Sequence, residues 1–354
     1  MPMQSNRDGG VAIIITLSIL LVLSISLMKI LESRTVEVAH LNNNINRFHA
    51  KSLARSLFRA ILSSIRKQGL VVVKMGLERL PPQLPNILES GSFSNLVVRP
   101  IDHRFSLNRK FTQIADQDRA RIFFNIIKNM RSESENYSLT EDDIYPVLSA
   151  LNDWWDADDF PDDQYHDGIE TYYQEELRFE IKDSMFDFLS EMKLIPRVRE
   201  LKLSYRKLRS HFRVKGAVQM FIDINLASEQ EISDFLQKYA DLDSYLVVYE
   251  NRLAIAEIAK QNMPSTLEPK YPLGVDPNSS SSVWRQELES LGIYAQMDSK
   301  EKKLFKTKSN HIEIDYTISS GNISLGLNSI VKLHYGGAKG DKVERFEILS
   351  YSYR

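Results

Sequence analysis

Acidic side chains are concentrated in one segment near the middle of the chain. Seven aspartates and one glutamate fall within the 18 residues 153–170. Hard cations such as Ca²⁺ take about six to eight oxygen ligands, which the carboxylates of one loop can supply. Acidic residues at alternate positions, such as Asp156 and Asp158, can converge on one ion, and Pro161 and Gly168 allow the chain to curl around it. The segment is therefore a candidate calcium site, although its spacing is not that of an EF-hand.

Two other interpretations of the acidic segment remain open. A run of charge is commonly a solvated surface loop. Paired carboxylates can also act as the acid and base of a hydrolase, but no nucleophile or phosphate-binding motif accompanies them, and we expect the chain not to be an enzyme. The seven histidines are scattered and do not indicate a histidine metal site. The adjacent Trp154 and Trp155 favour a segment that is anchored to a hydrophobic core.

Composition excludes several classes of function. The chain has 354 residues, no cysteine and a formal net charge of −2. It therefore has no disulfide framework, no thiolate metal site and no bulk attraction to nucleic acid. The segment from Ile224 to Ile232 resembles the opening of a helix-hairpin-helix module, but no glycine follows Phe235 to form the phosphate-binding hairpin. We interpret it as a packing helix and expect no nucleic-acid partner.

The N-terminus is organised as a polar leader followed by a long apolar helix. Ten mostly polar residues end in Gly9-Gly10, and an apolar run then extends from Val11 to Met28. A run of about 18–20 residues can cross a bilayer as one helix. Arg7 favours a cytoplasmic N-terminus, and no secretory cleavage site follows the run. This layout is typical of a type IV pilin-like subunit, although a plain signal anchor with a juxtamembrane helix remains an alternative.

In a pilin-like subunit, a prepilin peptidase would cut after Gly10 and leave Val11 as the first mature residue. Most such subunits carry a glutamate at the fifth mature position, which neutralises the amine of a neighbouring subunit. Here that position is Ile15, and no acidic residue lies between Val11 and Met28. A subunit without this carboxylate is difficult to add beneath another one, so we expect it to lie at the end of a fibre.

The pattern of the remaining chain predicts helices and strands in separate regions. The N-terminal helix is expected to continue to Gln68, where Gly69 offers a stop. Short strands are expected at 70–73 and 96–101, and helices at 116–130, 140–153, 184–192, 229–239 and 252–260. Alternating residues predict antiparallel strands over 311–318, 323–335 and 343–353, on which the N-terminal helix could pack.

Two short segments resemble each other, although the chain shows no repeat of fixed period. Asn108 follows Phe105-Ser-Leu, and Asn225 follows Ile224. Both segments precede a predicted helix, so we expect each asparagine to cap exposed backbone N–H groups at the helix start.

The ordered set of motifs resembles the K-type minor pseudopilin family of the type II (general) secretion system. Gly10-Val11-Ala12-Ile13 looks like the family's processing site. The remaining elements that are similar to its motifs, in order, are Arg104–Asn108, Leu151–Asp158, Glu170 with Tyr172 and Tyr173, Phe188–Pro196 and Ile224–Ser228. The spacing from Glu170 to the tyrosines differs from the family's by a residue.

The resemblance implies a pilin-like α+β fold, with a long N-terminal helix and an antiparallel sheet, interrupted by a large inserted helical domain. It divides the chain into a leader (1–10), a transmembrane part (11–30) and a periplasmic part (31–68) of the helix, and a first part of the pilin-like core (69–108). The helical domain (109–264), a linker (265–289) and the C-terminal strands (290–354) follow. The chain would be a single-pass protein of the bacterial inner membrane with its C-terminal domain in the periplasm.

The resemblance also implies function. It predicts a place at the tip of the secretion pseudopilus, with the I- and J-type minor pseudopilins, the major pseudopilin and prepilin peptidase as partners. It predicts bound Ca²⁺, with ligands carried over by position to Asp156, Asp158 and Glu170, and with further candidates in Asp153, Asp159, Asp162 and Asp167. The alternatives are a minor pilin of a type IV pilus or DNA-uptake system, and a membrane-anchored calcium-binding protein with no fibre.

Overall fold

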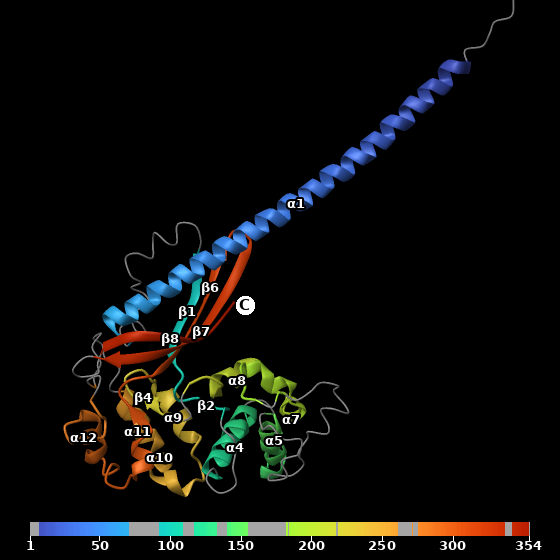
Figure 1. The fold of residues 1–354 in the computed structure, drawn as a ribbon. Coiled ribbons are helices and arrows are strands. Elements are labelled where there is room, and N and C mark those ends of the chain that lie inside the picture. Colours follow the sequence, from blue (N-terminus) through green and yellow to red (C-terminus); the bar gives the residue numbers. More distant parts are fainter. Residues whose placement is uncertain are drawn as a thin grey trace, which may run out of the picture.

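The computed structural model describes residues 7–70, 92–108, 117–132, 140–154, 182, 184–216, 219–260, 271, 275–336 and 342–353. Helix α1 (Arg7–Gln68) is one 62-residue helix (Figure 1), about 90 Å long at roughly 1.5 Å per residue. It passes unbroken through Asn42–Asn44 and ends where the sequence predicted. Gly69 adopts φ +86°, and its N–H donates to the Ile65 carbonyl over 2.9 Å, which closes the helix.

A four-stranded antiparallel sheet packs against the second half of α1. Its strands are β1 (Ser92–Pro100), β6 (His311–Ser320), β7 (Ile323–Gly336) and β8 (Lys342–Tyr353), in the order β1-β6-β7-β8. The three C-terminal strands confirm the sequence prediction. Strand β1 precedes the helical region and pairs with β6, so the sheet is interrupted by an insertion in the chain, as expected. The expected strand at 70–73 lies mostly outside the described residues.

One face of the sheet forms a core with α1. Alternate β6 residues, including Ile314 and Tyr316, pack with Ala54, Leu57 and Ile61 of the helix. The Tyr316 hydroxyl donates to the Ala54 carbonyl over 2.5 Å. The small Ala54 side chain allows this close approach of helix and sheet. We call the face of the sheet that points away from α1 the outer face.

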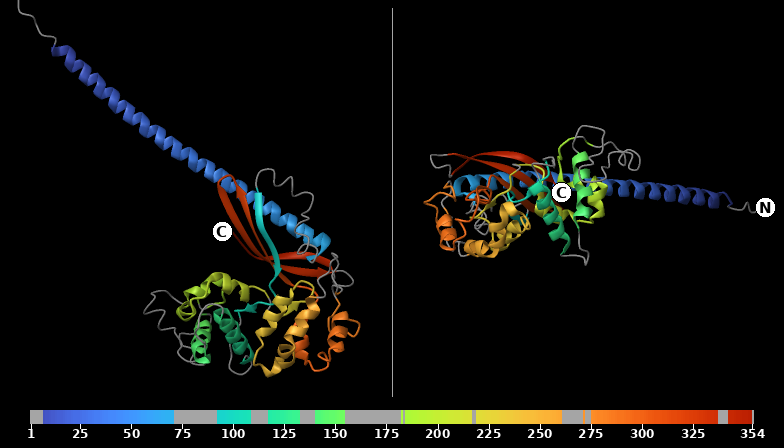
Figure 2. Two further views of the ribbon diagram at one scale, coloured as in Figure 1. Left: turned by 180° about the vertical axis from the view of Figure 1, so that it is seen from behind. Right: turned by 90° about the horizontal axis from the view of Figure 1, so that it is seen from below.

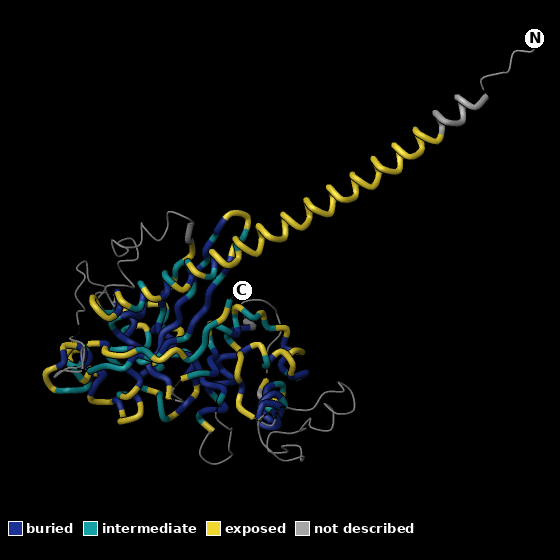
Figure 3. The backbone as a smooth tube through the Cα atoms, turned by 45° about the horizontal axis from the view of Figure 1, so that its top comes forward, coloured by how far each residue is buried: buried dark blue, intermediate teal, exposed yellow. Residues whose placement is uncertain are grey.

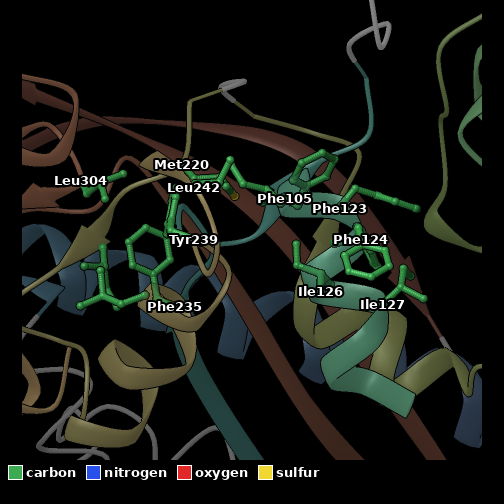
Figure 4. Close-up of a cluster of buried hydrophobic side chains, with 14 of the residues drawn as sticks. Phe105, Phe123, Phe124, Ile126, Ile127, Met220, Phe235, Tyr239, Leu242 and Leu304 are labelled. Carbon is green, nitrogen blue, oxygen red and sulfur yellow. The ribbon is translucent and has the colours of Figure 1, made fainter. Parts of the chain in front are cut away.

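The helical domain lies on the outer side of the sheet, as Figures 1 and 2 show. Its first part contains α4 (Gln117–Ser132), α5 (Glu141–Asp153), the 3-10 helix η3 (Leu189–Leu194), α7 (Pro196–Glu200) and α8 (Tyr205–His211). Its second part contains α9 (Glu229–Gln237), η4 (Asp243–Tyr245), α10 (Leu246–Glu250), α11 (Arg252–Lys260), α12 (Val283–Ser290) and α13 (Ser299–Lys302). Both parts share one hydrophobic core, part of which is drawn in Figure 4.

The linker predicted over 265–289 does not extend to residue 289, and the C-terminal strands predicted from residue 290 do not begin there. Residues 283–290 form α12. Trp284 is fully buried with its ring centroid 5.2 Å from that of Phe305. The domain's core therefore continues to Phe305. Prolines and serines suggested a flexible connection, but one large aromatic side chain anchors this segment to the core.

Two parallel strand pairs were not predicted and reveal that the helical domain consists of two similar units. In the first unit, β2 (Phe105–Ser106) pairs with β3 (Phe212–Arg213). In the second, β4 (Ile222–Asp223) pairs with β5 (Phe305–Lys306). The residue after each first strand donates its N–H to the end of the second strand: Leu107 to Arg213 and Ile224 to Lys306, both over 2.9 Å. Two-residue strands carry too little pattern to be recognised in a sequence.

Asn108 and Asn225 occupy equivalent positions in these two units. Their predicted helix-capping role is wrong. The Asn108 side chain bonds the Phe186 N–H and carbonyl and the Val214 carbonyl at 2.6–2.9 Å. The cap of α9 is Ser228, which accepts from the Glu231 N–H and forms a capping box with it.

Other elements deviate less from the predictions. Helices α4, α5, α9 and α11 lie where helices were expected, within about two residues. The helix expected over 184–192 is instead the short 3-10 helix η3 at Leu189–Leu194, followed directly by α7. Pro196 begins α7, and a proline at the first helical position ends the preceding turn.

Candidate functional site

The N-terminal part of α1 projects from the body of the protein. Its side chains from Ile15 to Ile45 are exposed, as the yellow tube in Figure 3 shows. An 18-residue window in this part has a mean hydropathy of 2.0 and no buried residue. It belongs to the one helix among the described residues that is long and apolar enough to cross a membrane. Gly10 and Val11 lie within the first turns of this helix.

The segment of α1 between the apolar run and the sheet carries a second apolar surface. Val38, Leu41, Ile45 and Phe48 recur at spacings of three, four and three residues, and their exposed fractions range from 45% to 72%. We call these four residues the exposed stripe. At about 100° per residue they lie on roughly the opposite side of α1 from the residues that contact the sheet. The stripe therefore offers a helix-packing surface that the described part of the protein leaves exposed.

The acidic segment is described only at its beginning. Asp153 is the last residue of α5, and its side chain is fully buried, as is that of Asn152. The other predicted ligands, Asp156, Asp158, Asp159, Asp162, Asp167 and Glu170, lie outside the described residues. Within the described ranges no group of three or more His, Asp or Glu side chains is placed to hold a metal ion. The predicted ligand set therefore stays a prediction.

Trp154 fixes the start of the acidic segment to the core, as the sequence predicted. The indole is 3% exposed. It stacks on Phe186 with ring centroids 5.9 Å apart and an interplanar angle of 9°. Phe186 is itself held by Asn108. The first residues of the acidic segment are thus held in the core beside Asn108 and Phe186 of the first helical unit.

A buried carboxylate joins the helical domain to the outer face of the sheet. Glu313 of β6 accepts hydrogen bonds from Arg104 at 2.8 Å and from Arg209 of α8 at 2.7 Å. Arg99 of β1 also donates to it at 2.8 Å. The Glu313 side chain is 2% exposed. Arg209 donates further to Asp315 at 2.7 Å, so one helix of the insertion is tied to two positions of the same strand.

The electrostatics of this junction favour the ionised carboxylate. Burial alone would raise the pKa of Glu313, but the guanidinium groups of Arg104, Arg99 and Arg209 hold that pKa well below its ordinary value. Removing one partner from such a buried group of charges costs about 3–5 kcal/mol. The junction therefore fixes the orientation of the helical domain on the sheet.

A second buried carboxylate reinforces the junction. Asp102 accepts from Arg213 of β3 at 3.1 Å and is 2.7 Å from Nδ1 of His311. It also accepts from the backbone N–H of Asn310 and of His311. Burial favours a raised pKa for Asp102, but the hydrogen bond from His311 and the charge of Arg213 lower it. β3 of the first unit and β6 of the sheet are thereby linked through one side chain.

This junction is not evident from the sequence. Arg104 stood out only as the first residue of a motif, and Glu313 only as a polar residue in an alternating strand. The available signal was a pair of acids, Glu313 and Asp315, on one face of a strand. Such residues usually face water, so the arginines that bury them could be found only from the fold.

Comparisons with known proteins agree with this architecture. No family model matches the chain, and no curated protein matches its sequence. A chain in the crystal structure of the GspK-GspI-GspJ complex from the enterotoxigenic Escherichia coli type 2 secretion system has a similar fold. The two share 14% sequence identity with a TM-score of 0.53, over 89% of this chain and 98% of that chain. The likeness confirms the predicted pilin-like α+β fold.

Proposed function

We propose that this protein is a minor pseudopilin of a type II secretion system and that it lies at the tip of the pseudopilus. The observation that carries the proposal is the fold: a long helix and antiparallel sheet, interrupted by a helical domain, shared along most of the chain with a component of the GspK-GspI-GspJ complex. A minor pilin of a type IV pilus would need the helix and sheet but not this insertion.

Two features of the chain support a place at the tip. The segment from Val11 to Met28 lacks the carboxylate that would neutralise the amine of a subunit beside it. The helical domain adds bulk on the outer side of the sheet and is fixed there by Glu313 and Asp102. A subunit of this width is difficult to place within a closely packed fibre. We therefore propose that the subunit starts or caps the fibre.

The exposed stripe supports pilin-like partners. Neighbouring helices of the I- and J-type minor pseudopilins and of the major pseudopilin would cover it. Ca²⁺ bound by the acidic segment completes the proposal, with Asp156, Asp158 and Glu170 as ligands. The donors are all carboxylates, which suit a hard cation, and the buried Asp153 and Trp154 hold the segment to the domain.

Cleavage of the leader tests whether the N-terminal helix is that of a pilin-like subunit. In cells with active prepilin peptidase, the mature protein should begin at Val11, and Gly10→Ala should retain the full leader. Gly9→Ala is the matched control and should be processed normally. N-terminal sequencing reads both results directly. A protein that still begins with Met1 in such cells would contradict the proposal.

Assembly is tested separately from processing. Leu41→Asn places a polar group in the exposed stripe, whereas Val36→Asn makes the same change on the opposite side of α1. We expect only Leu41→Asn to reduce co-purification with the I- and J-type subunits, while both variants keep the parent's melting temperature. A membrane-anchored protein with no fibre would show no such co-purification in any variant.

A further inference from the structure

A cavity of about 290 Å³ lies between the outer face of the sheet and the first helical unit. Ser350 and Ser352 of β8 line it on one side, and Phe188 and residues 212–215 line it on the other. We propose that this cavity, together with the adjoining edge of β8, binds an extended acidic segment of a partner protein. The inference does not depend on a role in secretion.

The walls of the cavity carry more positive than negative charge. The cations are Arg104, Arg209, Arg213 and Lys215, and the anions are Asp187 and Glu313. Lys215 is the most exposed of these cations, with 32% of its side chain accessible. It lies 3.3 Å from the Asp187 carboxylate, which Lys182 also contacts at 2.9 Å. Arg209 and Arg213 are also paired with Asp315 and Asp102. Lys215 is therefore the cation that an entering acidic side chain would meet, whereas a basic side chain would be repelled.

The β8 edge is suited to pairing only beside the cavity. Strand β8 is the last strand of the sheet, and among the described residues no strand pairs with its other edge. Its first half carries Lys342, Glu344, Arg345 and Glu347, and charged edges oppose pairing. Its last four residues, Ser350–Tyr353, are uncharged, and alternating serine and tyrosine favour a strand.

An irregularity separates these two halves. Ile330 of β7 pairs with Ser350, but Val331 pairs with Ile348, which leaves Leu349 as an extra residue. Such a bulge re-aims the strand that contains it. After the bulge, Tyr351 and Tyr353 turn toward α1, where Phe58 and Arg55 contact them. Ser350 and Ser352 face the cavity with their small side chains, which leaves room for those of an added strand.

A strand added at this edge would use both the unpaired edge of β8 and the cavity beside it. Its backbone would pair with the edge at Ser350–Tyr353, and its alternate side chains would enter the cavity, as in other cases of β-strand addition. Phe188 lies at the cavity with 63% of its surface exposed. It offers an apolar contact to the incoming segment.

A random octapeptide library displayed on phage tests the proposal on the full chain in lipid nanodiscs. We expect selection of peptides that alternate β-branched or aromatic residues with at least one acidic residue. Their binding should be at least tenfold weaker to Lys215→Glu and unchanged to Lys342→Glu, which makes the same charge change on the charged half of β8. Thermal melting curves show that both variants are folded.

The position of the bound peptide is tested by cross-linking. Because the chain has no cysteine, Ser352→Cys and Glu347→Cys each introduce a single thiol. A selected peptide with one cysteine should form a disulfide with position 352 and not with position 347. Failure to enrich peptides, selection of helical or basic peptides, equal binding to Lys215→Glu, or trapping at position 347 would each overturn the proposal.

Discussion

Asn108 and Asn225 perform the same structural task in two successive units of the helical domain. Each side chain bonds the N–H and the carbonyl of one aromatic residue, Phe186 or Tyr271, and the carbonyl of the residue after a parallel strand. An amide group is suited to this task because it donates and accepts at once. The two short sequence segments that resemble each other therefore mark a repeated clasp.

Replacing either asparagine should destabilise the domain locally. Asn108→Ala and Asn225→Ala each remove three hydrogen bonds, which at about 1 kcal/mol each predicts a loss of about 2–4 kcal/mol in the free energy of unfolding. Hydrogen exchange should accelerate at the Phe186 amide in the first variant and at the Tyr271 amide in the second. Asn251→Ala, which removes one side-chain bond to Val247, is the control. Equal exchange at both amides in both variants would contradict independent clasps.

The Glu313 junction should make stability sensitive to acid. The pKa of Glu313 is lowered in the folded protein, so its contribution is fully present above the ordinary carboxyl pKa of about 4.5 and is lost as the pH falls toward the folded value. Glu313→Gln should cost about 3–5 kcal/mol at pH 7 and should flatten the stability curve below pH ~4.5. Chemical denaturation from pH 7 to pH 2 measures both effects. Glu344→Gln, at an exposed position of β8, should match the parent curve.

The buried ammonium of Lys238 should destabilise the fold, whereas the carboxylate of Glu313 stabilises it. Burial and, to a lesser extent, the charge of Arg104 lower its pKa to about 7, and its ammonium donates one hydrogen bond to the His103 carbonyl at 2.8 Å. A lowered lysine pKa destabilises the fold most below pH 7, and this penalty fades as the pH rises toward 10.5.

Lys238→Met should therefore stabilise the protein by several kcal/mol at pH 6, since a tenfold change in protonation equilibrium corresponds to about 1.4 kcal/mol. The gain should disappear near pH 10. Lys303→Met, at an exposed position, should leave stability unchanged at both pH values. Equal melting temperatures of the parent and Lys238→Met at pH 6 would be evidence against a buried ammonium.

Calcium should stabilise the helical domain. A ligand present at about 100 times its dissociation constant adds about 2.7 kcal/mol to the free energy of unfolding. We expect Ca²⁺ to raise the melting temperature, EGTA to reverse the rise, and Asp158→Asn or Glu170→Gln to abolish it. Asp142→Asn, at an exposed position of α5, should respond like the parent. A melting temperature that does not change with Ca²⁺ would show that the acidic segment is a solvated loop.

The sequence alone determined the long helix, its end at Gly69 and the three C-terminal strands. These features follow from local patterns: apolar periodicity of 3.6 or 2 residues and the φ > 0 freedom of glycine. Most of the larger helices of the insertion were predictable for the same reason. The motif order was also sufficient to predict the pilin-like fold, because it depends on several short elements in succession.

Tertiary structure alone decided how these elements are joined. The Glu313 junction brings Arg99, Arg104 and Arg209 together across more than 100 residues of chain, and no local pattern encodes such a pairing. Trp284 turned an apparent linker into core, because burial of one aromatic ring outweighs the local preference of prolines and serines. Asn108 and Asn225 look like caps in the sequence. They are clasps because their partners lie on segments that only folding brings within hydrogen-bond reach.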